Sequence, residues 1–224
     1  MTALEEYDAL WNAARSAFHD GGLTVDRAPV DGGPRWGISL VMIPPPPLVE
    51  ALADVSARLG RAYTGPQHLH DPHDLHLTVT SLEPYRDEVD RAMIDHYVDA
   101  VEQSRDLLDL HVRVVGLGGS PAGVFAQGLD DDTLLPIRRR MRRATADLHD
   151  GVPTPMAFIR NTAHISLSVH RRAEREPAAA DFVERHRRTP LGEMTGARIA
   201  LVRYRARGDA IGVEVLHTVL PVVR

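Results

Sequence analysis

Two short segments of the chain share one alternating pattern, and this pattern constrains the fold more than any other feature. Residues 75–80 read LHLTVT, and residues 163–168 read AHISLS. Both segments place a histidine, an aliphatic residue, a hydroxyl residue and another aliphatic residue in succession. Side chains of a strand point alternately to the two faces of a sheet. Each segment is therefore predicted to be a β-strand with one buried apolar face and one polar face.

The polar face of each predicted strand presents an imidazole followed by two hydroxyl groups. These side chains are His76, Thr78 and Thr80 in the first segment and His164, Ser166 and Ser168 in the second. Two facing imidazoles can divide acid–base catalysis, one acting as general base and the other as general acid. Hydroxyl groups can donate hydrogen bonds to phosphate oxygens. The paired pattern therefore favours phosphoryl chemistry.

The elements around the two segments follow the same order in both halves of the chain: strand, helix, proline-containing loop and strand. Apolar spacing predicts helices over residues 3–19, 48–60, 89–101, 134–148 and 178–186. Strands are predicted over residues 35–43, 75–82, 110–117, 124–129, 163–169, 197–205 and 211–220, the last two joined by a Gly-Asp turn. Short connections and this repeated order predict an α+β fold with mixed or antiparallel sheets and a duplicated architecture.

Composition excludes several other chemistries. The 224 residues include no cysteine, and the 26 basic residues are all arginine. A thiolate nucleophile, Cys-ligated zinc, a Schiff base and a P-loop lysine are therefore absent. A net charge of −5 argues against binding of extended nucleic acid, which requires a broadly basic surface. The apolar runs are too short for a membrane span and the acidic N-terminus is not a signal peptide, so we expect a cytoplasmic protein.

The two motifs lie 88 residues apart in equivalent positions, and together they resemble the paired motif of the 2H phosphoesterases. That superfamily includes bacterial RNA 2′,3′-cyclic phosphodiesterases, also called 2′-5′ RNA ligases. The resemblance runs from about Arg35 to Leu220. It implies a single bilobal domain over residues 35–224, with an N-terminal helix and loop extension over residues 1–34. The implied α+β fold is pseudo-two-fold, with helices outside and a cleft between the lobes.

The resemblance also implies a function. It assigns His76 and His164 as catalytic residues and Thr78 and Ser166 as phosphate-binding residues. The implied activity is metal-independent hydrolysis of a 2′,3′-cyclic phosphate, or of a related cyclic phosphate or 2′-5′ phosphodiester, in a nucleotide or short RNA. No cofactor is implied, and we expect a monomer. His164 is taken as the base and His76 as the acid, although the near-symmetry of the motifs leaves the reverse assignment open.

Other readings of the sequence use different features. A non-catalytic nucleotide-binding or RNA-binding module could share the fold without turning its ligand over. The His-rich loop of residues 67–74, together with His76, could instead serve a metal-dependent hydrolase, although we interpret it as a polar loop without a metal. In a third reading the motif histidines have only a structural role.

The arginines offer further candidates for substrate binding. Arg160 shares the parity of His164, and Arg203 and Arg205 lie on one face of a predicted strand with Tyr204 on the other. We take these three arginines as candidate contacts for a substrate phosphate or base. The run of five arginines within residues 138–143 is interpreted as the solvated surface of a helix.

Overall fold

The computed structural model describes residues 2–28, 30, 33, 37–85 and 88–219. Its strands are β1 (Ile38–Ile43), β2 (His68–Leu69), β3 (Leu77–Glu83), β4 (Arg113–Ser120), β5 (Gly123–Leu129), β6 (Ala163–Val169), β7 (Gly192–Glu193), β8 (Arg198–Arg207) and β9 (Ala210–Val219). Its helices are α1 (Ala3–Asp20), α2 (Pro46–Ala62), α3 (Arg91–Glu102), α4 (Leu134–Leu148) and α5 (Pro177–Arg185), with 3₁₀ turns η1 (Pro72–Asp74) and η2 (Arg105–Leu107).

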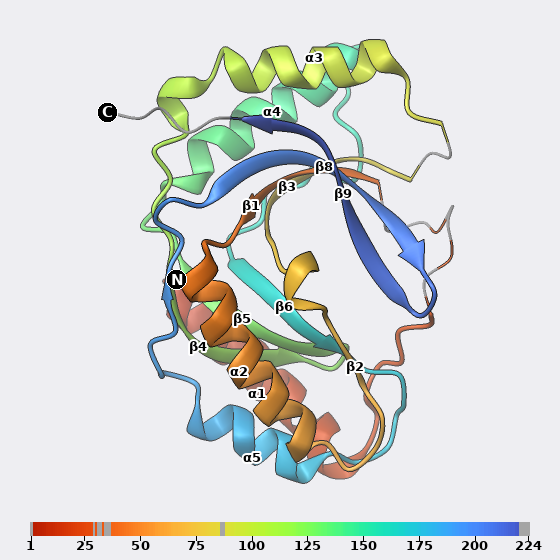
Figure 1. The fold of residues 1–224 in the computed structure, drawn as a ribbon, viewed down its shortest axis with the longest axis vertical. Helices are drawn as coiled ribbons and strands as arrows, with labels where there is room; N and C mark the ends of the chain where they lie inside the picture. The colour runs from red at the N-terminus through yellow and green to blue at the C-terminus, as the bar shows by residue number, and fades with distance from the viewer. Residues whose placement is uncertain (1, 29, 31–32, 34–36, 86–87, 220–224) are drawn as a thin grey trace.

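The described strands form one antiparallel sheet in the order β7-β4-β5-β6-β3-β1-β8-β9, and β2 pairs with β6 beside this path. The sheet curls, so that β3, β1, β8 and β9 lie above β6, β5 and β4 in Figure 1. Helices α3 and α4 cover the outer side of the upper half, and α1 and α5 cover that of the lower half (Figure 1). The motif strands β3 and β6 are neighbours at the centre of the sheet.

Every helix and strand expected from the sequence is present, with ends that shift by a few residues. The turn between β8 and β9 falls at Gly208, whose φ of 65° is a backbone conformation that glycine adopts without strain. The sequence did not indicate the two-residue strands β2 and β7. The expected first residue of β1, Arg35, and the expected last residue of β9, Leu220, lie outside the described residues, as does the expected domain boundary at 34/35.

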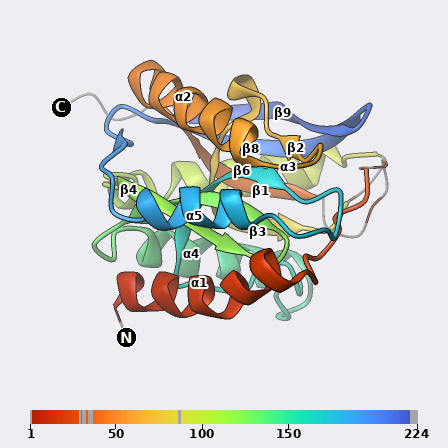
Figure 2. The same ribbon diagram turned by 90° about the horizontal axis from the view of Figure 1, so that it is seen from below.

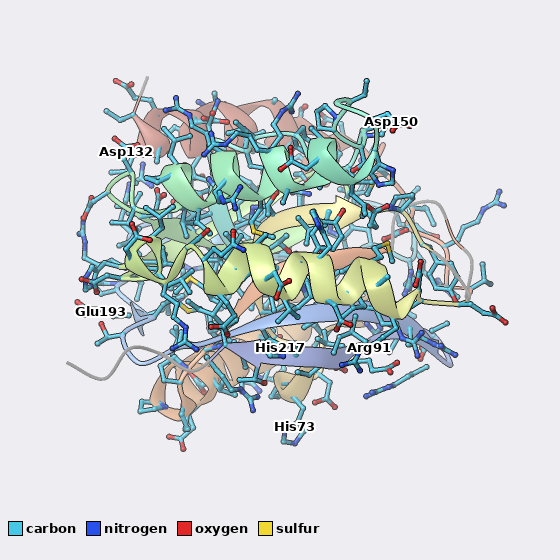
Figure 3. The ribbon with its side chains drawn as sticks, turned by 90° about the horizontal axis from the view of Figure 1, so that it is seen from above. His73, Arg91, Asp132, Asp150, Glu193 and His217 are labelled. Carbon is cyan, nitrogen blue, oxygen red and sulfur yellow. The ribbon has the colours of Figure 1, made fainter. Side chains whose placement is uncertain are left out.

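The two halves of the chain exchange their helices. Helix α4 connects β5 to β6 in the second half, yet it packs against β3 and α3 of the first half. Helix α2 connects β1 to β3 in the first half, yet it packs against α5, β6 and β7. Figure 3 shows α3 and α4 side by side, with Asp132 and Asp150 marking the two ends of α4. No helix within the described ranges is long and apolar enough to cross a membrane.

Helix α1, expected as an extension, is built into the lower half of the molecule. It starts with a capping box in which the Thr2 hydroxyl accepts from the Glu5 backbone while the Glu5 carboxylate accepts from Thr2. Its buried face packs on β4, β5 and α5, and Figure 2 shows α1 and α5 side by side. The Trp11 indole donates to Glu184 of α5 over 2.6 Å. The hydroxyl of Tyr7 hydrogen-bonds Ala163, the residue next to His164.

Replacement of Trp11 by alanine is expected to destabilise the whole domain, because its side chain is 1% exposed and its cavity would remain unfilled. We expect a loss of about 3–5 kcal/mol in the free energy of unfolding, measured by urea denaturation. The neighbouring Leu10 is 39% exposed and provides the control, since Leu10→Ala should cost no more than about 0.5 kcal/mol. A loss of stability in Trp11→Ala as small as that expected for Leu10→Ala would show that α1 does not belong to the core.

Candidate active site

His164 lies on β6 and His76 immediately precedes β3, and these two antiparallel strands meet at one residue pair, Leu77 opposite Ile165. Both of these side chains are buried, at 0% and 1% exposure. Continuing the antiparallel register by one residue in each direction places His76 beside Ser166 and Thr78 beside His164. The imidazoles and hydroxyls of the two motifs therefore interleave on one surface, and all four side chains are partly exposed.

The second hydroxyl of each motif does not belong to this surface. Each motif strand has an irregular register one residue after its first hydroxyl. In β3, Thr78 pairs with Val41 and Thr80 with Leu40, and in β6, Ser166 pairs with Phe125 and Ser168 with Val124. Such a bulge shifts the alternation of side chains by one residue.

As a result, Thr80 and Ser168 turn into the core, where each is 2% exposed. Ser168 Oγ lies 2.7 Å from the Tyr63 hydroxyl, and Thr80 donates to the Ser81 carbonyl. The expectation that these two hydroxyls face a substrate therefore fails, because strict alternation ends at the bulge.

His76 is held by hydrogen bonds at both ring nitrogens. Its Nδ1 lies 2.7 Å from the Asp74 carbonyl oxygen, and its Nε2 lies 3.1 Å from the Tyr204 hydroxyl. A carbonyl only accepts, so Nδ1 carries the proton, and in the neutral ring Nε2 accepts from Tyr204. Burial lowers the pKa of His76, while the Asp74 carbonyl and carboxylate act in the opposite direction.

His164 has a more cationic environment. Its ring packs on Phe125 with 4.9 Å between ring centroids. Burial lowers the pKa of His164 to about 4, and the positive charges of Arg160, His76 and Arg138 contribute to the decrease. The two histidines occupy matching positions in the sequence motifs, but the described groups that act on them differ: Asp74 favours the protonated form of His76, and cations disfavour that of His164.

Tyr204 belongs to the site and was missed in the sequence. Strand β8 pairs with β1 so that Tyr204 is on the same face as Ser39, Thr78 and His76. Hydrogen bonds with Thr78 and Ser39 lower the pKa of Tyr204, but burial outweighs them and raises it. The alternation along residues 203–205 predicted that Tyr204 and the two arginines beside it lie on opposite faces of the strand. The local pattern could not indicate which of these faces points to the histidines.

The candidate arginines divide into two groups. Arg160 lies before β6, in a loop, and its charge acts on both His164 and Tyr204. Its guanidinium stacks over Phe158 at 4.7 Å, and no carboxylate among the described residues forms an ion pair with it. Arg203 points to the opposite face of β8 from Tyr204, where Glu214 binds it over 2.8 and 3.0 Å. Arg205 shares that face, so of these three candidates Arg160 is the one whose charge acts on a motif histidine, His164.

The His-rich loop lies close to the site without forming a metal cluster. Strand β2 pairs His68 with Val169, and the His70 backbone donates to the Leu167 carbonyl. Burial lowers the pKa of His70 to about 4, and the charge of His76 contributes. Within the part of the chain that the structure describes, no three His, Asp or Glu side chains are grouped to hold a metal ion.

The interpretation of the arginine run as solvated surface is wrong for Arg138. This side chain is 3% exposed and points inward from α4, while the next residue, Arg139, is exposed. Arg142 is also partly buried and donates to the Ala157 carbonyl over 3.1 Å. Arg138 and Arg160 line a cavity of about 380 Å³ beside the N-terminal end of α4, together with Asp130 and Asn161.

Solved structures with the same fold are known. TT0787 of Thermus thermophilus is 21% identical, with 81% of this chain and 95% of that chain covered and a TM-score of 0.61. E. coli LigT complexed with ATP is 13% identical, with 84% and 98% covered and a TM-score of 0.56. The conserved protein ATU0111 from Agrobacterium tumefaciens is 17% identical, with 92% and 97% covered and a TM-score of 0.55. No protein-family model and no curated protein matches the sequence.

These similarities define the class of fold. The chain has the mixed α+β fold of LigT, with a curled antiparallel sheet and helices on its outer sides. The fold that the paired motifs implied is therefore confirmed. At this level of identity, the similarity establishes the architecture and leaves the chemistry to the residues of this chain.

Loss of the Arg160 charge is expected to raise the pKa of His164 above about 4, because Arg160 is the first of the three cations that lower it. Arg160→Gln tests this, with the pKa of His164 measured by NMR titration of its imidazole. Arg203→Gln is the matched control, since that guanidinium faces away from the histidines and should leave the titration unchanged. An unchanged His164 pKa in Arg160→Gln, or an equal change in the control, would contradict this placement.

Proposed function

We propose that the protein is a metal-independent phosphodiesterase of the 2H type. Its substrate would be a 2′,3′-cyclic phosphate, or a related cyclic phosphate or 2′-5′ phosphodiester, in a nucleotide or short RNA. The observation that carries the proposal is the interleaving of two imidazoles and two hydroxyls across β3 and β6. A binding module needs no pair of imidazoles, whereas acid–base catalysis uses both, one neutral and one protonated.

The catalytic residues would act in one in-line displacement. His164 takes a proton from water as the water oxygen forms a bond to phosphorus. His76 gives a proton to the ribose oxygen as its bond to phosphorus breaks, and the product is a phosphomonoester. Thr78 and Ser166 donate hydrogen bonds to the non-bridging oxygens. Arg160, which has no carboxylate partner among the described residues, offsets the negative charge.

Electrostatics supports His164 as the base and His76 as the acid. Burial and the charges of Arg160, His76 and Arg138 favour the neutral form of His164. The carbonyl and carboxylate of Asp74 favour the protonated form of His76. A base must start neutral and an acid must start protonated, so the two environments match the two roles.

Solved structures of this fold support phosphate as the recognised group. E. coli LigT has been crystallised with ATP and with phosphate, at TM-scores of 0.56 and 0.53 to this chain. A further structure of the same fold, described as a phosphoesterase, has a TM-score of 0.51. For this chain we propose a nucleotide or short RNA as the ligand, and a monomer that acts in the cytoplasm.

Removal of either imidazole is expected to abolish most of the turnover. His76→Ala and His164→Ala should each lower kcat by about 10²–10⁴-fold, the usual contribution of a general acid or base. The substrates are 2′,3′-cyclic mononucleotides, ADP-ribose cyclic phosphate and 2′-5′ dinucleotides. His73→Ala is the control, because His73 is exposed in η1.

Three outcomes would contradict the proposal. Near wild-type hydrolysis in both single variants would exclude two-histidine catalysis. Binding of cyclic nucleotides by the wild-type protein without turnover would indicate a binding module. Loss of activity after chelation with EDTA would indicate a metal-dependent hydrolase.

The activity is expected to be highest at mildly acidic pH. The neutral base His164 is lost as the pH falls through about 4. The protonated acid His76 is lost as the pH rises through its pKa, which burial lowers from its ordinary value. A profile of kcat/KM against pH reports these groups in the free enzyme and should be bell-shaped. An optimum above pH 7 would contradict this pair of environments.

A further inference from the structure

Arg138 of α4 is a buried cation whose hydrogen-bonding partners are backbone carbonyls. Its Nε donates to the Val79 carbonyl over 2.9 Å. Its Nη1 donates to the Arg160 carbonyl over 2.6 Å, and its Nη2 donates to the Thr162 carbonyl over 2.8 Å. One planar group therefore uses its three nitrogens on three carbonyls, a geometry that a guanidinium provides and a lysine ammonium does not.

One of these carbonyls belongs to the first motif segment, and the other two lie just before the second. Val79 follows Thr78 in β3, at the position where the register of β3 becomes irregular. Arg160 and Thr162 belong to the segment that leads directly into His164. The two strands themselves share one registered pair, Leu77 with Ile165. Beyond that pair, Arg138 supplies direct hydrogen bonds between the segments that carry the catalytic groups.

We propose that Arg138 is a positioning residue that sets the separation and orientation of the two histidine motifs. This inference rests on the proposed function, because it concerns the geometry of the same reaction. Through the Arg160 carbonyl, Arg138 also holds the backbone of the arginine that would contact the phosphate. A displacement of about 1 Å between reacting groups can lower a rate by about 10²-fold.

The charge of Arg138 has a second consequence at the site. It is one of three cations that act on His164, with Arg160 and His76. Burial lowers the pKa of Arg138, the charge of Asp130 opposes this decrease, and the charge of Arg160 adds to it. The positioning role and the charge effect of Arg138 can be separated experimentally, because lysine keeps the positive charge but lacks the planar guanidinium.

The test compares the variants Arg138→Lys and Arg138→Met with the wild-type protein. Arg139→Met is the matched control. Arg139 is the next residue of the helix and is exposed, so its replacement should change nothing. Both Arg138 variants should lower kcat by about 10–10²-fold with KM changed less than about threefold. The acidic limb of the pH profile should move to higher pH in Arg138→Met and stay in place in Arg138→Lys.

Full wild-type kcat in Arg138→Lys would overturn the proposal, and so would an equal loss in Arg139→Met. If Arg138→Met does not fold, Arg138→Lys alone decides. A second readout is independent of turnover. The imidazole resonances of His76 and His164, and their response to added inorganic phosphate, should change in Arg138→Lys while those of exposed His73 stay constant. If the wild-type protein hydrolyses none of the substrates, the proposed function fails, and unchanged resonances would then separately refute the positioning role.

Discussion

The site depends on the antiparallel contact between β3 and β6. Leu77 and Ile165 are buried opposite each other there, and the residues on either side of them carry the imidazoles and hydroxyls. The register of this pair, continued by one residue on each side, places the imidazole of each motif beside the hydroxyl of the other. The bulges in β3 and β6 occur at equivalent points, so both polar faces end after the first hydroxyl.

Neighbouring groups make two similarly buried histidines chemically different. Burial disfavours the protonated form of both imidazoles, but the neighbouring groups have opposite effects on the two pKa values. His76 lies against the Asp74 carbonyl, whereas the charges of Arg160 and Arg138 act on His164. Two groups of the same type can thereby take opposite roles in one proton-transfer sequence. The pseudo-symmetry of the backbone thus supports an asymmetric electrostatic arrangement.

Most of the fold and half of the candidate site could be predicted from the sequence. The alternation around His76 and His164 is a local property, and local periodicity indicates strands well. The inward position of Tyr204 depends on the register of β8 with β1, which no local pattern contains. The bulge that buries Thr80 likewise depends on a partner strand. Arg138 lies in an arginine-rich helical stretch, and its carbonyl partners come from distant parts of the chain.

The exchange of α2 and α4 between the two halves has a consequence for how the molecule folds. Each half places its helix on strands of the other, and β8 from the end of the chain completes the sheet beside β1. The order of helices and strands therefore repeats along the chain, but neither half is an independent folding unit. Contacts between distant segments must form before either half can bury its apolar surface, a topology that slows folding. During synthesis, the histidine surface could acquire Tyr204 only after some 200 residues have been made.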